Sequence, residues 1–417
     1  MKKGSAGELA ILGGPRVVEP GLGQSWPILD ATDVRAVQGV LERGVLSGRG
    51  APEMQALEDE FAKDTAVDHC LATNSGTSAL VMALGAAGVG PGDEVLVPAF
   101  TYVATAQAVL QRAATPIFVD IDPATYSMDP FRIAEKIGPR TRAIIPVHLH
   151  GLPAEMQTIT EIARINGELT VIEDAAQAHG ADYQGQRVGS LGVMAAFSLN
   201  STKNLPAGEG GLFVTNSAEF AKRAAEIRFN GLDPNPGWNP SRPLDGLRDS
   251  VATTSGAMFL PGEMTAALGR SQLRRLSVTT ERAIRNGSRM SARLKEFPGF
   301  VVPAVPEDRT HVFHKYRLGF DADGLGYRKG SSALRDTLVT VLRAEGVEVS
   351  LWQTAPLPRH PVFEDGELYP VTQAVLDASL VVGTQSYPLF AQPACVIDAW
   401  ANAFEKVWQH REQLGRL

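Results

Sequence analysis

The chain has 417 residues, 44% of them hydrophobic and 20% charged, and a formal net charge of -7. Its length predicts two domains, and its mild acidity argues against the broad basic face that a nucleic-acid-binding protein needs. We therefore expect no nucleic-acid partner. The chain has only two cysteines and no visible signal peptide, which favours the reducing cytoplasm, and it has no apolar run long enough to predict a membrane span.

The first half of the chain carries an alternating pattern. Residues 1–25 are rich in glycine and proline and are expected to form an arm, and Thr32 is a candidate cap for a helix that follows it. Alternation of strands and helices predicts a mainly parallel α/β sheet with helices on both faces, whose ligands gather where strands end. The expected strands are 94–97, 116–119, 143–147, 170–172 and 212–215, and the expected helices are 78–87, 102–112, 131–136, 156–166 and 218–228.

The second half is expected to differ. The insert 231–245 carries four prolines, which makes regular structure there unfavourable. One long helix is expected from about Glu263 to past Arg285 as a bridge to a smaller α+β domain. That domain has candidate strands at 314–320 and 347–351 and a helix at its end. The predicted division is an arm over 1–25, a large domain over 26–285 and a small domain over 286–417.

Lys203 is the most informative single residue. It stands between an apolar run at 197–199 and a glycine cluster at 208–211. A lysine held in a dry pocket has a lowered pKa and can form a Schiff base with a carbonyl cofactor. For one lysine alone, a solvated loop position is the commoner explanation.

Three further clusters fit the same kind of cofactor. Gly76 and Thr77 open a helix, where free N–H groups can bind a phosphate. Asp174 follows an apolar strand and can pair with a protonated pyridine nitrogen. Tyr102 follows another strand and can stack on a flat ring. Each cluster alone also has an ordinary structural explanation: a capped helix for Gly76 and Thr77, a helix cap for Asp174 and a core aromatic for Tyr102. Together, however, the clusters meet the needs of pyridoxal phosphate.

Other kinds of catalytic site find little support. The eight histidines include the close pairs His148/His150 and His311/His314, without a cysteine partner or an H-E-x-x-H context, so no metal site is expected. The chain also contains no G-x-S-x-G elbow, Walker loop or Rossmann glycine fingerprint.

These motifs resemble those of the sugar and cyclitol aminotransferases of the DegT/StrS family, within the fold-type-I pyridoxal-phosphate enzymes. The match is dense from about residue 25 to 215 and weaker in the last third. It includes Ser-Gly-Thr-Ser-Ala-Leu at 75–80, Glu-Asp-Ala-Ala-Gln-Ala-His-Gly at 173–180 and Ser-Thr-Lys-Asn-Leu at 201–205. The resemblance implies an aspartate-aminotransferase-like large domain and pyridoxal 5'-phosphate as the cofactor.

The resemblance also implies a role for each candidate residue. Lys203 would form the Schiff base and shuttle the substrate proton, and Asp174 would pair with the pyridine nitrogen. Tyr102 would stack on the ring, and Gln177 would lie beside the ring and its oxygen. The residues implied for the phosphate are Gly76, Thr77 and Ser198. A homodimer with active sites at the interface is implied as well.

One segment departs from the family. Family members usually carry Gly-Tyr-Asn-Tyr-Arg-Met before the bridging helix, and the asparagine reaches the phosphate held by the partner subunit. Here the segment 256–263 has Met258, whose side chain cannot make that hydrogen bond. The insert 231–245 is also unusual, and it stands where dimer contacts and substrate access are expected.

The resemblance implies transfer of an amino group from glutamate or glutamine to a keto sugar or keto cyclitol. The opening segment 9–16 favours the cyclitol and aminohydroxybenzoate branch. Three alternatives stay open. One is a dehydratase, although such family members replace the lysine with histidine. Another is a lyase acting on an amino acid, which needs an arginine for the α-carboxylate, and Arg317 is a candidate. The last is a non-catalytic, regulatory pyridoxal-phosphate-binding protein.

Overall fold

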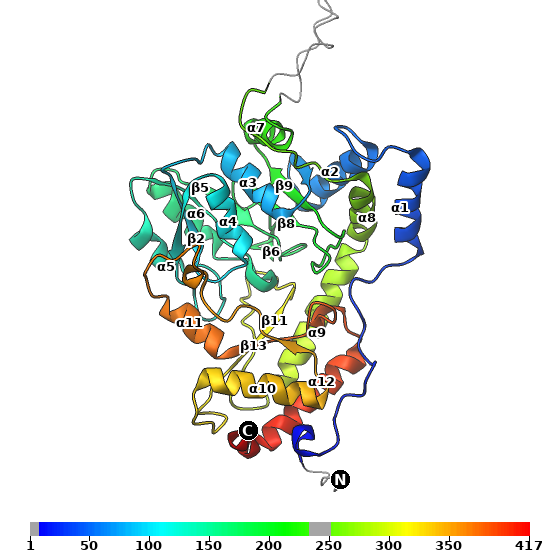
Figure 1. Cartoon of the computed structure of the whole chain (residues 1–417), viewed down its shortest axis with the longest axis vertical. Coiled ribbons are helices and arrows are strands. Elements are labelled where there is room, and N and C mark those ends of the chain that lie inside the picture. Colours follow the sequence, from blue (N-terminus) through cyan, green and yellow to red (C-terminus); the bar gives the residue numbers. More distant parts are fainter. Residues whose placement is uncertain (1–7, 233–251) are drawn as a thin grey trace, which may run out of the picture.

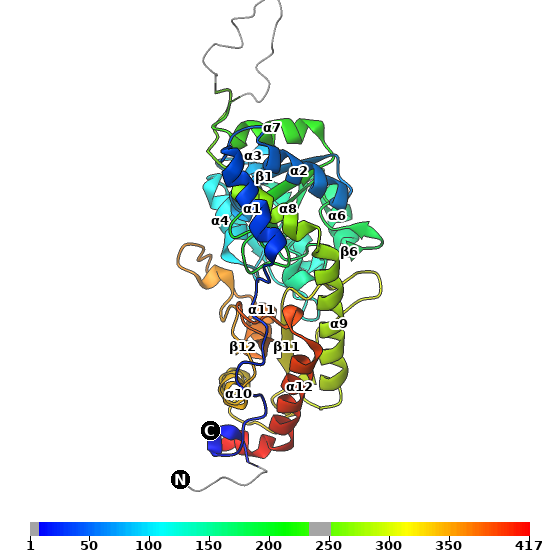
Figure 2. The same ribbon diagram turned by 90° about the vertical axis from the view of Figure 1, so that its right-hand side faces the viewer.

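The computed structural model describes residues 8–232 and 252–417. Figures 1 and 2 show an upper and a lower part of the molecule. The upper part is built on a sheet of seven strands and the lower part on a sheet of four. Helix α9 (Leu276–Leu294) runs from the upper part into the lower. The insert expected at 231–245 lies outside the described residues, apart from its first two.

The larger sheet is mainly parallel. Its strands are β1 (His69–Thr73), β2 (Glu94–Pro98), β3 (Thr115–Val119), β4 (Thr141–Ile144), β5 (Thr170–Asp174), β8 (Met194–Ser198) and β9 (Gly211–Thr215). They lie in the order β1-β9-β8-β5-β4-β2-β3. Neighbours from β8 to β3 pair parallel, whereas β9 pairs antiparallel with β8 and β1. The predicted fold class is confirmed for this part.

Helices cover both faces of the larger sheet. One face carries α3 (Gly76–Ala86), α4 (Val103–Gln111) and α7 (Ala218–Arg228), and the other carries α2 (Pro52–Thr65), α5 (Pro130–Ile133) and α6 (Met156–Ile165). Successive side chains of a strand point to opposite faces. In β2, Val95 and Val97 therefore pack on the α3 side, while Leu96 packs on the α6 side. A short hairpin of β6 (Asp182–Tyr183) and β7 (Gln186–Arg187) follows β5.

The first helix begins at a different cap from the one expected. Helix α1 (Ala31–Arg43) is capped by Asp30, whose carboxylate accepts from the backbone N–H of Thr32 at 2.7 Å. Asp33 in turn accepts from the backbone N–H of Asp30 at 2.8 Å, which completes a capping box. The prediction of Thr32 as the cap was therefore wrong.

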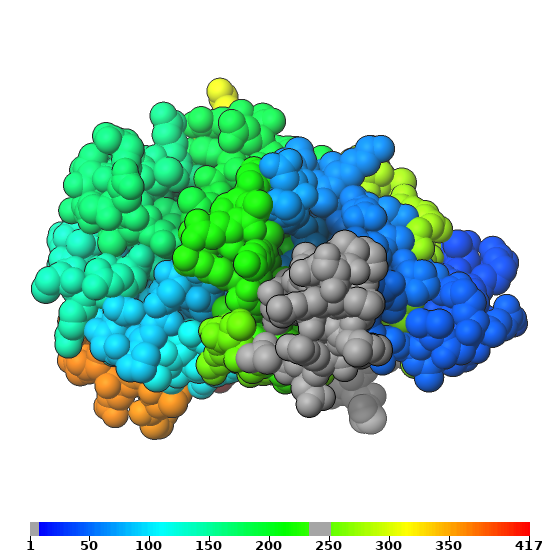
Figure 3. Space-filling view, turned by 90° about the horizontal axis from the view of Figure 1, so that it is seen from above, coloured from blue at the N-terminus to red at the C-terminus, as the bar shows by residue number. Residues whose placement is uncertain are grey.

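Figure 3 looks down on this end of the molecule, with the blue segments of α1 and α2 on one side and the cyan to green segments after β2 on the other.

The long helix expected from Glu263 is two helices. Helix α8 (Glu263–Leu273) ends before Arg274, and α9 begins at Leu276. Arg275 lies at the break, and its guanidinium pairs with Asp30 and Asp33 at the start of α1. Because these ion pairs join residues more than 200 positions apart, the sequence around Arg275 alone does not reveal the break between the two helices. No helix among the described residues is long and apolar enough to cross a membrane.

The smaller sheet is antiparallel. Its strands are β10 (Phe300–Val301), β11 (Tyr316–Phe320), β12 (Val349–Ser350) and β13 (Ser379–Val382), in the order β10-β11-β13-β12. Helices α10 (Ser331–Glu345) and α12 (Ala394–Gln409) share its apolar core with α9, and α11 (Pro370–Asp377) precedes β13. This arrangement confirms the α+β fold expected for the C-terminal part. The predicted boundary at 285/286 stays a prediction, and α9 crosses it.

The N-terminal segment packs against the smaller part. Leu9 and Val18 are buried in its core, and Figure 2 shows the blue trace running past it toward α1. The backbone N–H of Ala10 donates to Glu345 Oε1 at 2.8 Å, and that of Val18 donates to the Glu345 carbonyl at 2.9 Å. The segment 8–18 is thus anchored at both ends to one residue of α10.

Candidate active site

A cavity of about 400 Å³ opens where the strands of the larger sheet end. All seven predicted site residues line it. They are Gly76, Thr77, Tyr102, Asp174, Gln177, Ser198 and Lys203. A larger groove of about 490 Å³ lies beside α11, but its lining is mostly apolar and offers no constellation of titratable groups. The first cavity is therefore the candidate active site, and it is named the active-site cavity below.

The start of α3 forms one wall of the active-site cavity. Ser75 caps the helix by accepting from the backbone N–H of Ser78 at 3.1 Å. A Cβ on Gly76 would lie 2.9 Å from the Cβ of Ser198 and 3.2 Å from the Phe197 carbonyl oxygen. Glycine is therefore required for α3 to begin this close to the end of β8. Ser75, Gly76 and Thr77 line the cavity, so this capped helix N-terminus can offer its free backbone N–H groups to an anion.

Substituting Gly76 with alanine tests this close approach. We expect the dissociation constant of pyridoxal phosphate for the apoenzyme to rise about 10-fold or more, because the added methyl group displaces the wall that is expected to hold the phosphate. Gly90→Ala is the matched control, since a Cβ there meets nothing within 4 Å. Fluorescence titration of both apoenzymes gives the two constants. Equal constants would contradict the assignment of Gly76.

Asp174 is the last residue of β5 and is 5% exposed. Its carboxylate accepts from Thr105 Oγ1 at 2.7 Å and from the backbone N–H of Ala176 at 3.2 Å. Burial raises the pKa of this carboxyl above its usual value, while the hydrogen bonds and the Lys203 ammonium oppose the rise. The chain continues in turns rather than a helix, so the interpretation of Asp174 as a helix cap is wrong.

The neighbouring acid has a different task. Glu173 points away from the active-site cavity and is fully buried. It accepts from the backbone N–H groups of Gly189, Leu191 and Gly192 at 2.7–2.8 Å and contacts His148 Nε2 at 2.9 Å. His148 accepts a backbone N–H at Nδ1, so its proton sits on Nε2 and faces Glu173. Glu173 therefore fixes the end of β5, and of these two neighbouring acids only Asp174 lines the cavity.

Gln177 presents its amide to the active-site cavity. Its Oε1 accepts from the backbone N–H of His150 at 2.9 Å. In the described residues its Nε2 has no protein partner. This bond fixes the orientation of the amide, so that the nitrogen is available as a donor to a bound molecule.

Lys203 follows β8 in a loop that is held in place by hydrogen bonds at Lys203 itself and at the next residue. Its backbone N–H donates to the Asn200 carbonyl at 2.9 Å, and the side chain of Asn204 donates to the Val312 carbonyl at 3.1 Å. The lysine is half-buried, with its side chain on the cavity wall. Burial lowers its pKa from 10.5 to about 8, although Asp174 and Glu209 oppose the shift. The interpretation as a solvated loop lysine does not fit this position.

The lowered pKa of Lys203 predicts a pH dependence. A neutral amine is the reactive form, so the rate of acylation of Lys203 in the apoenzyme should rise about tenfold per pH unit up to about pH 8 and then level off. Peptide mass spectrometry after brief treatment with acetic anhydride measures this rate, with the exposed Lys222 as the internal reference. A rate that keeps rising in proportion to hydroxide beyond pH 9 would show that the cavity does not lower this pKa.

The sequence did not predict the four lining residues that come from the smaller part. His314, Lys315, Trp352 and Gln385 line the active-site cavity from the smaller part. A strand was expected from His314 onward, yet no motif assigned these side chains to a site. The one available signal was a lysine at the start of a predicted strand. Burial, together with the Lys203 and Arg317 cations, lowers the pKa of Lys315 from 10.5 to about 7.

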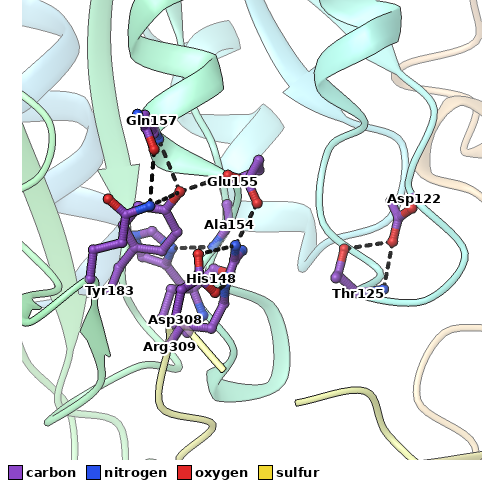
Figure 4. A network of polar contacts seen from close by, with 11 residues as sticks. Asp122, Thr125, His148, Ala154, Glu155, Gln157, Tyr183, Asp308 and Arg309 are labelled. Atoms are coloured by element: carbon purple, nitrogen blue, oxygen red, sulfur yellow. Dashed lines mark hydrogen bonds and ion pairs between the residues drawn. The ribbon is translucent and has the colours of Figure 1, made fainter. Parts of the chain in front are cut away.

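A polar network holds the segment 308–315 against the larger part (Figure 4). The side chain of Arg309 is buried and donates to Glu155 and to the Pro153 carbonyl, and its guanidinium lies 4.6 Å from the ring centre of Tyr183. The Tyr183 hydroxyl donates to Glu155 at 2.6 Å. Backbone bonds then continue along the segment, from Val312 to Gly151 and from Lys315 to His150. This attachment carries His314 and Lys315 to the cavity wall.

Arg317 is not in the active-site cavity. It is 2% exposed and lies among aromatic rings. Its Nε donates to His150 Nε2 at 3.0 Å, and its terminal nitrogens donate to Ser379 Oγ and to the Trp352 carbonyl. All of its nitrogens are therefore occupied within the protein. Arg317 is therefore not available to bind the α-carboxylate of a substrate, as an amino-acid lyase would require.

Met258 stands apart from the active-site cavity of its own chain. Its side chain is 51% exposed and does not line the cavity. Its carbonyl accepts from Asn74 Nδ2 at 3.4 Å, close to the start of α3. In the described residues, no group of three His, Cys, Asp or Glu side chains is arranged to hold a metal ion.

A mainly parallel sheet with a buried acid, a lysine and a helix N-terminus around one cavity defines the class of aspartate-aminotransferase-like enzymes. The model of the DegT/DnrJ/EryC1/StrS aminotransferase family matches residues 27–392, and the chain belongs to this family. The resemblance seen in the motifs, the fold-type-I fold and the assignment as an aminotransferase are thereby confirmed.

The names of three similar proteins refer to a sugar, a cyclitol and an aminohydroxybenzoic acid. The chain is 34% identical over 402 residues to dTDP-3-amino-3,4,6-trideoxy-alpha-D-glucose transaminase of Streptomyces venezuelae, covering 95% of this chain and 98% of the relative. It is 35% identical over 329 residues to L-glutamine:2-deoxy-scyllo-inosose aminotransferase of Micromonospora echinospora, covering 76% of each. The crystal structure of 3-amino-5-hydroxybenzoic acid synthase has a TM-score of 0.82 and 28% identity, covering 95% of this chain and 99% of that one.

Proposed function

We propose that this aminotransferase uses pyridoxal 5'-phosphate to move an amino group from glutamate or glutamine to the keto group of a sugar or cyclitol. The observation that carries the proposal is the cavity in which Lys203, Asp174 and the start of α3 come together. The relatives support the two halves of the proposal separately, because one is named for a nucleotide sugar and the other for glutamine and a cyclitol ketone.

The residues present suit this cofactor. The N-terminus of α3 and the Ser198 hydroxyl offer donors for a phosphate, and the tight approach at Gly76 leaves the backbone open to it. Asp174 offers a buried carboxylate for a protonated ring nitrogen. The remaining ring contacts are assigned to Tyr102 and Gln177. When bound, the cofactor supplies an electron sink for the negative charge left when the substrate loses a proton.

The protein's own residues supply proton transfer and orientation. The amine of Lys203, with a pKa near the working pH, is able to take a proton from the substrate carbon and to return it. The Thr105 hydroxyl holds Asp174 in place. Trp352 and His314 narrow the cavity from the side of the smaller part and exclude water from the reacting atoms.

A homodimer in the cytoplasm, with shared active sites, is part of the proposal. The support for a dimer is the exposure of Met258 near the start of α3, in the segment that the family resemblance implies contacts the partner subunit. Met258 leaves this chain without the usual cross-subunit asparagine, so the partner's contribution to phosphate binding is expected to be weaker here. Sedimentation of the holoenzyme gives the oligomeric state.

The absorption spectrum tests the proposed reaction. Purified protein with added cofactor should show the band of lysine-bound pyridoxal phosphate, and glutamate or glutamine should convert it to the band of the amine form. The amine-loaded enzyme is then offered keto cyclitols and keto nucleotide sugars, and recovery of the first band identifies the acceptor. The absence of any band with cofactor supplied would overturn the whole proposal, and a band insensitive to donors would point to a lyase or a non-catalytic protein.

A further inference from the structure

The active-site cavity contains more charge than the cofactor uses. Its described lining includes the acids Asp174 and Glu209 and the lysines Lys203 and Lys315. Lys203 and Asp174 are assigned to the cofactor. Glu209 is exposed and accepts from Asn200 Nδ2 at 2.7 Å. Lys315 is the charge that remains without an assigned partner.

Lys315 lies in surroundings that favour an incoming anion. Among the described residues, its ammonium has no hydrogen-bond acceptor, and its one polar contact is the face of the Trp352 ring, 5.7 Å from the ring centre. The charges that act on it are those of Lys203 and Arg317, both positive. The neighbouring His314 is buried, and its pKa is held well below the usual value by burial and by these lysines. No nearby carboxylate compensates Lys315.

The chemistry of the two substrates decides which anion fits. An amino donor carries its α-carboxylate on the carbon that bears the reacting amine, so this carboxylate enters the cavity close to Lys203. A sugar or cyclitol ketone carries hydroxyl groups next to its reacting carbon, and any phosphate lies farther away. Lys315 shares the cavity with Lys203, whereas the buried Arg317 is fully occupied.

We propose that Lys315 binds the α-carboxylate of the amino donor, a role that rests on the transaminase function proposed above. The lysine replaces the arginine commonly used for such a carboxylate. The ammonium pairs with the donor carboxylate in the first half-reaction and with the carboxylate of the departing keto acid afterwards.

Rapid mixing of the holoenzyme with glutamate and with glutamine tests this role. In Lys315→Met, the donor concentration for half-maximal conversion should rise about 10- to 100-fold, because a charge-assisted hydrogen bond is lost, while the maximal rate changes little. The reverse reaction of the amine-loaded enzyme with 2-oxoglutarate should weaken by a similar factor. Lys315→Arg should restore most of the affinity. Lys222→Met, on the exposed face of α7, is the control.

A binding measurement separates failure of this role from failure of the proposed function. Glutarate has carboxylates but no amine, so calorimetry of its binding to the holoenzyme needs no reaction. Binding to the wild type that is lost in Lys315→Met supports the carboxylate site even if neither donor reacts. Absence of glutarate binding, equal binding in the variant, or a variant defective only toward the keto acceptor would overturn the assignment.

Discussion

Replacing Lys203 with alanine should abolish amino transfer and remove the absorption band of lysine-bound cofactor. The rate of the donor half-reaction should fall about 10³-fold or more, because the variant loses the nucleophile and the group that carries the substrate proton. The other cavity residues remain, so pyridoxal phosphate should still bind, with the spectrum of the free aldehyde. Stopped-flow spectroscopy with glutamate measures the rate, and dialysis measures how readily the cofactor leaves.

The control for this variant is the exposed Lys222→Ala, which should leave spectrum and rate unchanged. Addition of a small amine such as methylamine should restore part of the Lys203→Ala activity, since it supplies the missing base from solution. Persistence of the lysine-bound band in Lys203→Ala would show that another lysine holds the cofactor, and Lys315 is the one other lysine among the described lining residues.

The site residues that the sequence predicted are those whose positions follow from local sequence patterns. Gly76 opens an apolar helix, and Asp174 and Lys203 follow apolar runs typical of strands. Parallel strands bring their ends to one edge of a sheet. Their convergence on one cavity therefore follows from local structure plus a simple topology. The distinction between Glu173 and Asp174 did not follow, because it depends on three backbone N–H groups from another loop.

The residues that were missed come from contacts between distant segments. Lys315 reaches the cavity because Arg309 and the backbone around it attach to the larger part, more than a hundred residues away in sequence. The break between α8 and α9 has a similar origin, since Arg275 pairs with the start of α1. Hydrophobic periodicity contains no trace of such ion pairs. The interpretation of Arg317 as a candidate for binding an α-carboxylate was wrong for a related reason. Its guanidinium is buried and bonded within the protein, which the local sequence does not show.

Replacing Asp174 with asparagine should lower the rate of the donor half-reaction about 10²- to 10³-fold while leaving the protein folded. Asparagine has nearly the same shape and can still accept from the backbone N–H of Ala176. It lacks the charge that keeps a ring nitrogen protonated, so the cofactor becomes a weaker electron sink. Single-turnover kinetics measure the rate, and thermal unfolding of the same sample measures stability.

The adjacent acid provides the matched control. Both carboxylate oxygens of Glu173 accept from backbone N–H groups, three in all. In Glu173→Gln an NH₂ group replaces one of these oxygens, and an NH₂ group cannot accept the hydrogen bonds made there. This variant should lose about 1.5–3 kcal/mol of stability for each charged hydrogen bond it fails to keep, and its melting temperature should fall. Its folded fraction should retain most of the wild-type rate. If instead Asp174→Asn stays within tenfold of the wild type and Glu173→Gln loses the reaction, the two acids have the opposite roles, and the ring nitrogen must face the other side of β5.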